Sequence, residues 1–196
     1  QNINHDASFS MIEGIFDKHG KSLQIQCHLE RDGKKTIKRN RKAYKKIADH
    51  VGLIPVVVIS PTDIDLISEG SIVRRKFLDR TISQSDKKYL NNLVTYHRIL
   101  QQRNALLKHF SSTNSFDKDT LSTYDEKLVQ FGNPIHEARK KFIKTFHPLF
   151  HNRYQFISGN HEPVTVSYES KLDEHSFETL LEESLQKDRM LQYTSV

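Results

Sequence analysis

The sequence contains only one cysteine, Cys27, so no disulfide can form within the chain and zinc sites built from several cysteines are excluded. No apolar run approaches the roughly 18 residues that a membrane-spanning helix needs, and no signal peptide is visible. Apolar residues make up 36% of the chain, against roughly 45–50% in an average globular domain. These shortages predict a soluble, surface-rich chain with a thin core, in keeping with a reducing cytoplasm.

Basic residues are in excess. The formal net charge is +6 and the isoelectric point is near 9.3. Such a balance favours anionic partners, of which nucleic acid is the commonest, but it does not argue for any particular fold.

The first third of the chain has the pattern of strands. Apolar and polar residues alternate between Ser8 and Tyr44, with turn sequences at residues 18–20 and 32–33, which is typical of half-buried antiparallel hairpins. A short helix is expected at residues 45–51. Residues 53–59 are apolar without alternation, which predicts a strand covered on both faces. The segment therefore indicates half of an α/β head.

The middle of the chain predicts two long helices. In the second helix, apolar or aromatic residues recur at steps of three or four, which indicates a heptad seam. The seam comprises Leu121, Tyr124, Leu128, Phe131, Ile135, Ala138, Phe142, Phe146 and Leu149.

The segment from Tyr89 to Phe110 repeats the pattern less regularly, and a polar loop at residues 111–115 precedes Asp117, an acceptable helix N-cap. Helices joined by so short a loop are antiparallel, and about 25 residues at 1.5 Å each give an arm roughly 35–40 Å long. Pro134 is expected to kink the second helix near residue 130, where Gly132 weakens it.

The last part predicts a return to strand at Val164, Val166 and Tyr168, then an amphipathic helix from Ser176 to about Arg189, then a strand at residues 190–196.

One segment imitates a phosphate-binding loop. Residues 14–22, from Gly14 to Ser22, resemble G-x-x-x-x-G-K-[ST] but have five residues between the glycines in place of four. A phosphate loop must join a strand to a helix, whereas residues 23–27 alternate like a strand. We therefore interpret the segment as a hairpin turn and not as a phosphate cradle.

Other catalytic or metal-binding patterns are weak. His147 and His151 share a helix face, but Pro148 stands where a zinc-helix glutamate is required and no third ligand is near in sequence, so we interpret both histidines as solvated. Cys27 lies at an apolar strand position, where structural packing is expected. No arrangement of nucleophile and base is apparent.

A basic ribbon is the first candidate for nucleic-acid binding. Eight positive charges lie at positions 34–46, around an Asn40-Arg41 turn: Lys34, Lys35, Lys38, Arg39, Arg41, Lys42, Lys45 and Lys46. Such an edge could neutralise several duplex phosphates. Alternatively, it is a solvated hairpin edge whose lysines discourage pairing with other strands. Only Tyr44 is nearby, so stacking on bases is not supported.

A second candidate is the cluster Arg74, Arg75, Lys76 and Arg80, on a helix whose Phe77 is expected to face inward. Arginine forms bidentate contacts with phosphate or carboxylate, so ligand binding competes with a structural clamp to Asp79 or Asp63.

Four short segments match one family pattern in order and spacing. They are Ser60-Pro61-Thr62-Asp63, Arg74-Arg75-Lys76-Phe77-Leu78-Asp79, Tyr89-Leu90 and Gln102-Arg103-Asn104-Ala105-Leu106-Leu107-Lys108. With them the chain resembles the RecF family, bacterial DNA-repair ATPases related to the heads of structural-maintenance-of-chromosomes proteins. Residues 132–139 look like the second arm helix of that family, and residues 190–196 like the strand before its signature motif.

The resemblance implies an α/β fold: part of a P-loop, SMC-like ATPase head made of antiparallel hairpins and a buried strand, with an inserted antiparallel helical-hairpin arm. Residues 1–80 and 161–196 would belong to the head and residues 81–160 to the arm. The phosphate loop would precede residue 1 and the signature and acidic Walker B strand would follow residue 196, so we expect an internal fragment that is not an enzyme and holds no cofactor. The junction of head and arm, including Ser60 to Asp63, would sense nucleotide.

The resemblance further implies a role in DNA replication, recombination, repair and the SOS response, in the cytoplasm at the nucleoid. The full-length protein would be a weak DNA-dependent ATPase with ATP and Mg²⁺. Its ATP-bound homodimer would bind double-stranded DNA near single-strand gaps and assist recombinase loading with RecR and RecO. Lys34, Lys35, Lys38, Arg39, Arg41, Lys42, Arg74, Arg75 and Arg80 are the predicted DNA contacts. The alternatives are a stand-alone antiparallel coiled-coil interaction module, and a true P-loop enzyme that uses residues 14–22.

Overall fold

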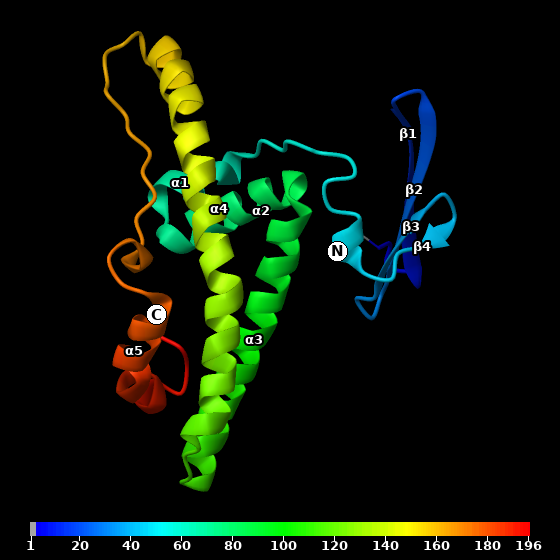
Figure 1. Cartoon of the computed structure of the whole chain (residues 1–196). Coiled ribbons are helices and arrows are strands. Elements are labelled where there is room, and N and C mark those ends of the chain that lie inside the picture. Colours follow the sequence, from blue (N-terminus) through cyan, green and yellow to red (C-terminus); the bar gives the residue numbers. More distant parts are fainter. Residues whose placement is uncertain (1–2) are drawn as a thin grey trace. The chain divides into compact units, whose positions relative to one another are not determined.

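The computed structural model describes residues 3–196, which divide into two compact units, one ending at Ile59 and the other running from Ser60 to Val196. The first unit is built on strands and the second on helices, as the ribbon in Figure 1 shows. The domain boundaries predicted at residues 80 and 160 stay a prediction.

The first unit is a four-stranded antiparallel sheet in the order β1-β2-β3-β4. Its strands are β1 (Phe9–Lys18), β2 (Lys21–Glu30), β3 (Lys35–Arg39) and β4 (Lys42–Ala43). Two-residue turns with positive φ at both central residues join β1 to β2 at His19-Gly20 and β3 to β4 at Asn40-Arg41. This turn geometry matches the right-handed twist of hairpin strands, so the hairpins predicted from alternation are confirmed.

The core of this unit covers one face of the sheet. Leu23, Ile25 and Ile37 are buried, and Tyr44 and Leu53 pack against them. The expected helix at residues 45–51 is reduced to a 3-10 turn, Ile47–Asp49.

The prediction of a buried strand at residues 53–59 is wrong for this structure. Residues 55–59 have no regular secondary structure, and the side chains of Val57 and Ile59 are 90% and 89% exposed. A strand needs a neighbouring strand that accepts and donates its backbone hydrogen bonds, and the described sheet consists of β1 to β4 without this segment. Its apolar composition indicated a strand, but composition does not supply the partner.

The second unit contains the predicted arm. Helix α3 (Lys87–Thr113) and helix α4 (Lys118–Ser158) are joined by residues 114–117 and pack along each other in Figure 1. The side chain of Asp117 accepts a hydrogen bond from the backbone N–H of Thr120, as expected of an N-cap. The antiparallel helical hairpin is therefore confirmed.

The seam of α4 is buried only where α3 lies beside it. Leu121, Leu128 and Ile135 are 1%, 0% and 4% exposed, whereas Leu149 is 63% exposed. Helix α4 has 41 residues and α3 has 27, so the last turns of α4 extend beyond the partner that the heptad pattern requires.

Helix α4 runs without a break through Pro134 and Pro148. Gly132 has a packing role that the sequence did not reveal: a Cβ built there would lie 2.4 Å from Cε1 of Phe177. The missing side chain lets helix α5 (Phe177–Leu191) approach α4 closely.

Three shorter helices precede the arm: a 3-10 helix (Pro61–Ile64), α1 (Asp65–Ser68) and α2 (Ser71–Ser85). Ser60 and Asp63 form a capping box at the start of the first of them. A further 3-10 turn, Lys171–Asp173, precedes α5.

The predictions of two strands near the end of the chain are wrong. Residues 163–170 alternate in burial but pair with no strand in the described chain. His147 and His151 hold this segment instead: the backbone N–H of Val166 donates to Nδ1 of His147 at 3.4 Å, and Nδ1 of His151 lies 3.3 Å from the carbonyl oxygen of Val164. The two histidines are thus partly buried structural residues and not solvated ones.

The predicted final strand is wrong in the same way, because α5 continues to Leu191 and the residues after it bind to side chains of α3 and α5. No helix of residues 3–196 is long and apolar enough to cross a membrane.

Candidate nucleic-acid interface

The segment that imitates a phosphate loop is a strand-turn-strand hairpin. Lys18 ends β1 and Lys21 begins β2, so no helix N-terminus faces the turn. The backbone N–H of Gly20 donates to the carboxylate of Asp17 at 3.1 Å, and the Lys18 ammonium donates to the carbonyl oxygen of Leu53 at 2.6 Å. The segment joins two paired antiparallel strands, so the hairpin interpretation is confirmed.

The basic ribbon lies on the β3–β4 hairpin and the turn before it. Its eight basic side chains, from Lys34 to Lys46, are all exposed. The first unit holds eleven Lys and Arg against six Asp and Glu, a net charge of +5 out of the +6 of the whole chain. The positive charge is therefore concentrated in the sheet, in the surroundings expected of a phosphate-binding edge.

The register shows that the ribbon does not form one flat patch. Arg39 pairs with Lys42, and Lys38 pairs with Ala43. Successive side chains of a strand point to opposite faces, so Arg39 and Lys42 share the face of buried Ile37 while Lys38 lies on the other. Arg41 stands in the turn between them, and the cations thus surround the end of the hairpin.

Acidic groups accompany two of these cations. Lys34 lies 3.8 Å from Glu30, an exposed ion pair of the kind that contributes little. Glu13 accepts hydrogen bonds from Gln24 and Gln26 at 2.7 and 2.6 Å. The hydrogen bond from Gln26, then that from Gln24, holds the pKa of Glu13 below its ordinary value, and Arg41 adds a smaller attraction.

The second basic cluster lies on α2. Arg74, Arg75, Lys76 and Arg80 are exposed, and the guanidinium of Arg74 reaches the carbonyl oxygen of Leu66 at 3.4 Å. Phe77 is 45% exposed and Leu78 is buried, so the predicted inward position of Phe77 is wrong by one residue.

Neither proposed carboxylate clamps these arginines. Asp63 caps the preceding turn by accepting from the N–H of Ser60 at 2.8 Å. Asp79 pairs with Arg139, whose Nη2 donates to both of its oxygens at 2.8 and 2.9 Å, and it also accepts from the Tyr89 hydroxyl. Burial, and then the hydrogen bond to Asp79, raises the pKa of Tyr89. This pairing ties α2, α3 and α4 together and leaves Arg75 and Arg80 without an ion-pair partner among the described residues.

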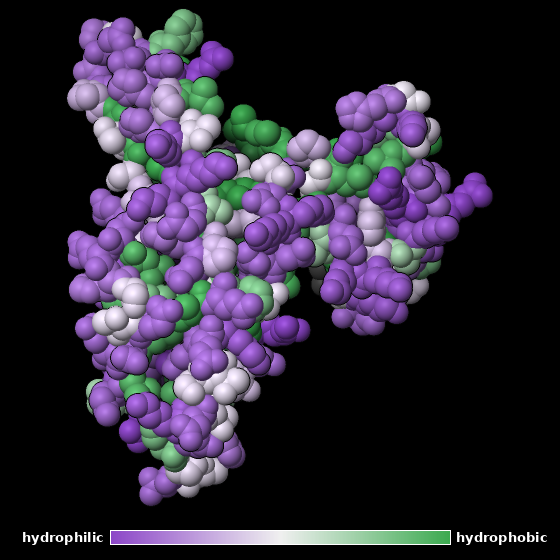
Figure 2. Space-filling model, viewed as in Figure 1, coloured by the Kyte–Doolittle hydropathy of each residue, from purple (hydrophilic) through white to green (hydrophobic). Residues whose placement is uncertain are grey.

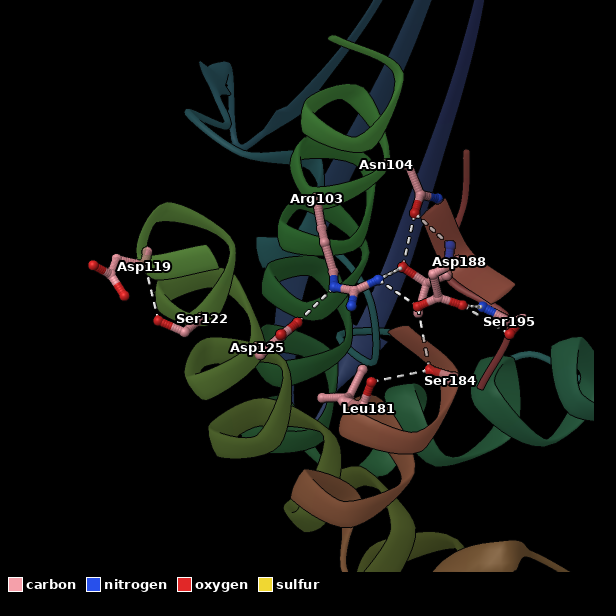
Figure 3. A network of polar contacts seen from close by, with 10 residues as sticks. Arg103, Asn104, Asp119, Ser122, Asp125, Leu181, Ser184, Asp188 and Ser195 are labelled. Atoms are coloured by element: carbon pink, nitrogen blue, oxygen red, sulfur yellow. Dashed lines mark hydrogen bonds and ion pairs between the residues drawn. The ribbon is translucent and has the colours of Figure 1, made fainter. Parts of the chain in front are cut away.

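Arg103 is the centre of a larger network, drawn in Figure 3. Its side chain is 0% exposed, and it donates to Asp125 at 2.5 Å, to Asp188 at 2.7 Å and to the hydroxyl of Thr194 at 2.9 Å. Asn104 accepts from the N–H and the hydroxyl of Thr194, both at 2.8 Å.

Asp188, also 0% exposed, accepts from the N–H and hydroxyl of Ser195 at 2.8 and 2.7 Å. The network joins both arm helices, α5 and the residues after α5.

In this chain the segments that carry the family resemblance take part in a capping box, the Asp79 pairing and the Arg103 network. Sequence reasoning did not find Asp125, Arg139 or Asp188, whose partners lie 22, 60 and 85 residues away. One signal was present, because Arg103 stands four residues after Ile99 and four before Leu107, on a buried stripe of α3.

No group of three or more His, Cys, Asp or Glu side chains that could hold a metal ion occurs within residues 3–196. The described part of the chain brings together six predicted DNA contacts on one hairpin and three on one helix. The two groups lie in different units and are two separate candidates.

Comparison with known proteins gives a consistent result. No family model matches the chain. The DNA replication and repair protein RecF of Flavobacterium johnsoniae is 50% identical over 195 residues, which is 100% of this chain and 54% of that protein. RecF of Parabacteroides distasonis is 41% identical over 100% of this chain and 52% of its own length, and RecF of Phocaeicola vulgatus is 39% identical over 99% and 52%.

Solved structures agree with the sequences. A structure of the recombination mediator protein RecF with ATP, from the RecFOR pathway, superposes with a TM-score of 0.87 at 28% identity, over 99% of this chain and 54% of that one. The chain spans about half the length of the relatives that it matches. The predicted α/β fold and the predicted resemblance are both confirmed, and this chain is similar, over its whole length, to about half of a RecF protein.

Proposed function

We propose that this chain is the part of a RecF-type DNA replication and repair protein that contributes a basic sheet and a helical arm to a DNA-binding ATPase. The observation that carries the proposal is the match to RecF with ATP at a TM-score of 0.87, together with 50% identity to a RecF sequence. In the full-length protein, ATP with Mg²⁺ would close a homodimer around double-stranded DNA near single-strand gaps. RecO and RecR would then cooperate with it in loading recombinase.

The chain's own contribution would be electrostatic. Phosphate contacts from Lys and Arg release counterions, so affinity falls with salt and depends little on base sequence. The ribbon presents exposed cations on both faces and at the turn of one hairpin, where several phosphates could be contacted at once. The rival interpretation, a solvated edge protected from strand pairing, predicts no such salt dependence.

The test uses the full-length protein with ATP and duplexes of unrelated sequence. Replacing Lys38, Arg39, Arg41 and Lys42 with Gln should weaken binding about equally for all duplexes. It should also lower the slope of log affinity against log salt by roughly 0.9 for each phosphate that the variant no longer neutralises.

The matched control removes four exposed lysines of the second unit, Lys108, Lys127, Lys144 and Lys187, by the same substitution. A smaller decrease of the slope in the control than in the ribbon variant supports the ribbon. An unchanged slope in the ribbon variant would indicate that the ribbon is a solvated edge. Replacing Arg74, Arg75 and Arg80 would then test the second candidate cluster.

We also propose that residues 1–196 alone neither bind nor hydrolyse ATP, because the segment from Gly14 to Ser22 is a hairpin and not a strand-to-helix loop. Calorimetry with ATP should show no saturable heat. Saturable binding that disappears in Lys21→Ala would contradict both this proposal and the assignment of the hairpin.

A further inference from the structure

A pocket of about 390 Å³ lies at the end of the arm, between the last turns of α3, the loop to α4 and the last turns of α5. On the face drawn in Figure 2, hydrophilic residues cover most of the molecule and hydrophobic residues occupy smaller areas. The pocket combines both kinds of surface. Its lining consists of Leu107, Phe110, Ser111, Asn114, Ser115, Phe116, Gln186, Arg189 and Met190.

The apolar floor is fixed by packing. Leu107 and Phe110 are 1% and 9% exposed, and the rings of Phe110 and Phe116 meet edge to face with centroids 5.5 Å apart. Gln192, just after α5, donates to the hydroxyl of Ser111 at 2.9 Å. Since α3, the loop and α5 are held to one another, the pocket is preformed and an occupant would not have to order its walls.

A cation stands over this floor. The guanidinium carbon of Arg189 lies 4.1 Å from the centre of the Phe116 ring. A guanidinium stacked on an aromatic ring keeps its N–H edge available for a planar, bidentate acceptor. Arg189 forms no ion pair with any described residue, and the carboxylate beside it in sequence, Asp188, is buried in the Arg103 network. Stacking therefore positions Arg189 without neutralising it.

The rim adds an apolar contact. Met190 is 77% exposed next to Arg189, and methionine is a flexible side chain that adapts to the surface it meets. Asn114, Ser115 and Gln186 supply polar groups around the opening. The pocket thus offers a hydrophobic floor and one unpaired, oriented cation side by side.

We propose that this pocket binds a short acidic-aliphatic peptide segment of a partner protein, with an aliphatic side chain against Phe110, Phe116 and Met190 and a neighbouring carboxylate paired with Arg189. The charge of Arg189 selects an anionic occupant, and the apolar floor selects a peptide over a free phosphate or a duplex backbone, which has no aliphatic group to bury. The site goes beyond the proposed function, because it needs neither nucleotide nor the basic ribbon.

The test is fluorescence anisotropy on the full-length protein with a labelled peptide of sequence Glu-Leu-Leu-Glu and its Gln-Leu-Leu-Gln and Lys-Leu-Leu-Lys counterparts. We expect saturable binding of the acidic peptide and about tenfold weaker binding of the other two, the loss that removal of one charge-assisted hydrogen bond produces. Arg189→Gln should reduce binding of the acidic peptide by a similar factor. Met190→Glu, at a position 77% exposed, should reduce it as well.

Lys108→Gln is the matched control, since it removes an exposed cation of the same helix end that does not line the pocket. Equal affinity for all three peptides, equal loss in the control, or no saturable binding of the acidic peptide would overturn the proposal. Displacement of the peptide by a short duplex in wild type but not in Arg189→Gln would instead assign the pocket to phosphate binding. Failure of the ribbon variant to change DNA affinity would leave this result untouched, so the two proposals can fail separately.

Discussion

The substitution Asp188→Asn tests whether the Arg103 network stabilises the second unit. Asparagine keeps the shape of aspartate, so the change removes charge without opening a cavity. The Asp188 carboxylate accepts from Arg103 at 2.7 Å and from the N–H and hydroxyl of Ser195. Both charged side chains, Arg103 and Asp188, are 0% exposed.

The expected loss of unfolding free energy depends on which partners Arg103 keeps in the Asp188→Asn variant. Breaking a buried pair on one side leaves an uncompensated buried charge and costs about 3–5 kcal/mol. Arg103 would still pair with Asp125 at 2.5 Å, which places the expected loss at the lower end, about 3 kcal/mol. Adding Arg103→Met should recover part of this loss, because it removes the stranded cation, and the coupling between the two sites should be at least about 1 kcal/mol.

The assay is urea unfolding followed by circular dichroism at the helix band, which reports on the second unit because the first unit is built on strands. Glu182→Gln, on the exposed face of α5, is the control and should change stability by no more than about 0.5 kcal/mol. A loss for Asp188→Asn as small as that of the control, or strictly additive effects of the two network substitutions, would refute the reasoning.

Three further predictions concern the same unit. Leu128→Ala, at a position 0% exposed on the seam of α4, should cost about 2–5 kcal/mol in urea unfolding, while exposed Lys127→Ala should stay within roughly 0.5 kcal/mol; similar small losses in both would contradict the arm packing. Gly132→Ala should destabilise by about 1 kcal/mol or more although alanine favours helices, because overpacking against buried Phe177 typically costs about 1–3 kcal/mol, and a raised melting temperature would show that the ring yields. Burial is the first cause of the raised pKa of Tyr89, so the stabilisation by the neutral Tyr89 hydroxyl is complete below the ordinary tyrosine pKa of about 10 and is lost as the pH rises above that value. The melting temperature of Tyr89→Phe should therefore fall less steeply with pH than that of wild type above about pH 10. Identical pH dependence of the two melting temperatures would exclude this contribution of Tyr89.

The sequence by itself determined the features that depend on neighbours along the chain. Alternation and turn residues predicted the hairpins, since strand period and two-residue turns are local properties. Steps of three and four predicted the arm, and the Asp117 cap and the polar loop predicted where its helices meet. The hairpin identity of Gly14 to Ser22 followed from the same local reasoning, because the residues after it alternate like a strand.

Only the tertiary structure decided which distant groups meet. Residues 53–59 and 163–170 have strand-like composition, but a strand exists only where another backbone accepts its hydrogen bonds, and local pattern carries no information about that partner. Arg103 and Asp188 are 85 residues apart, so their ion pair could not be inferred from spacing. The same holds for Gly132, which weakens a helix when judged locally and is required when Phe177 packs against it. The packing of whole helices decides which distant residues meet, and for this reason the charged residues Arg103 and Asp188 and the glycine Gly132 are buried in the core.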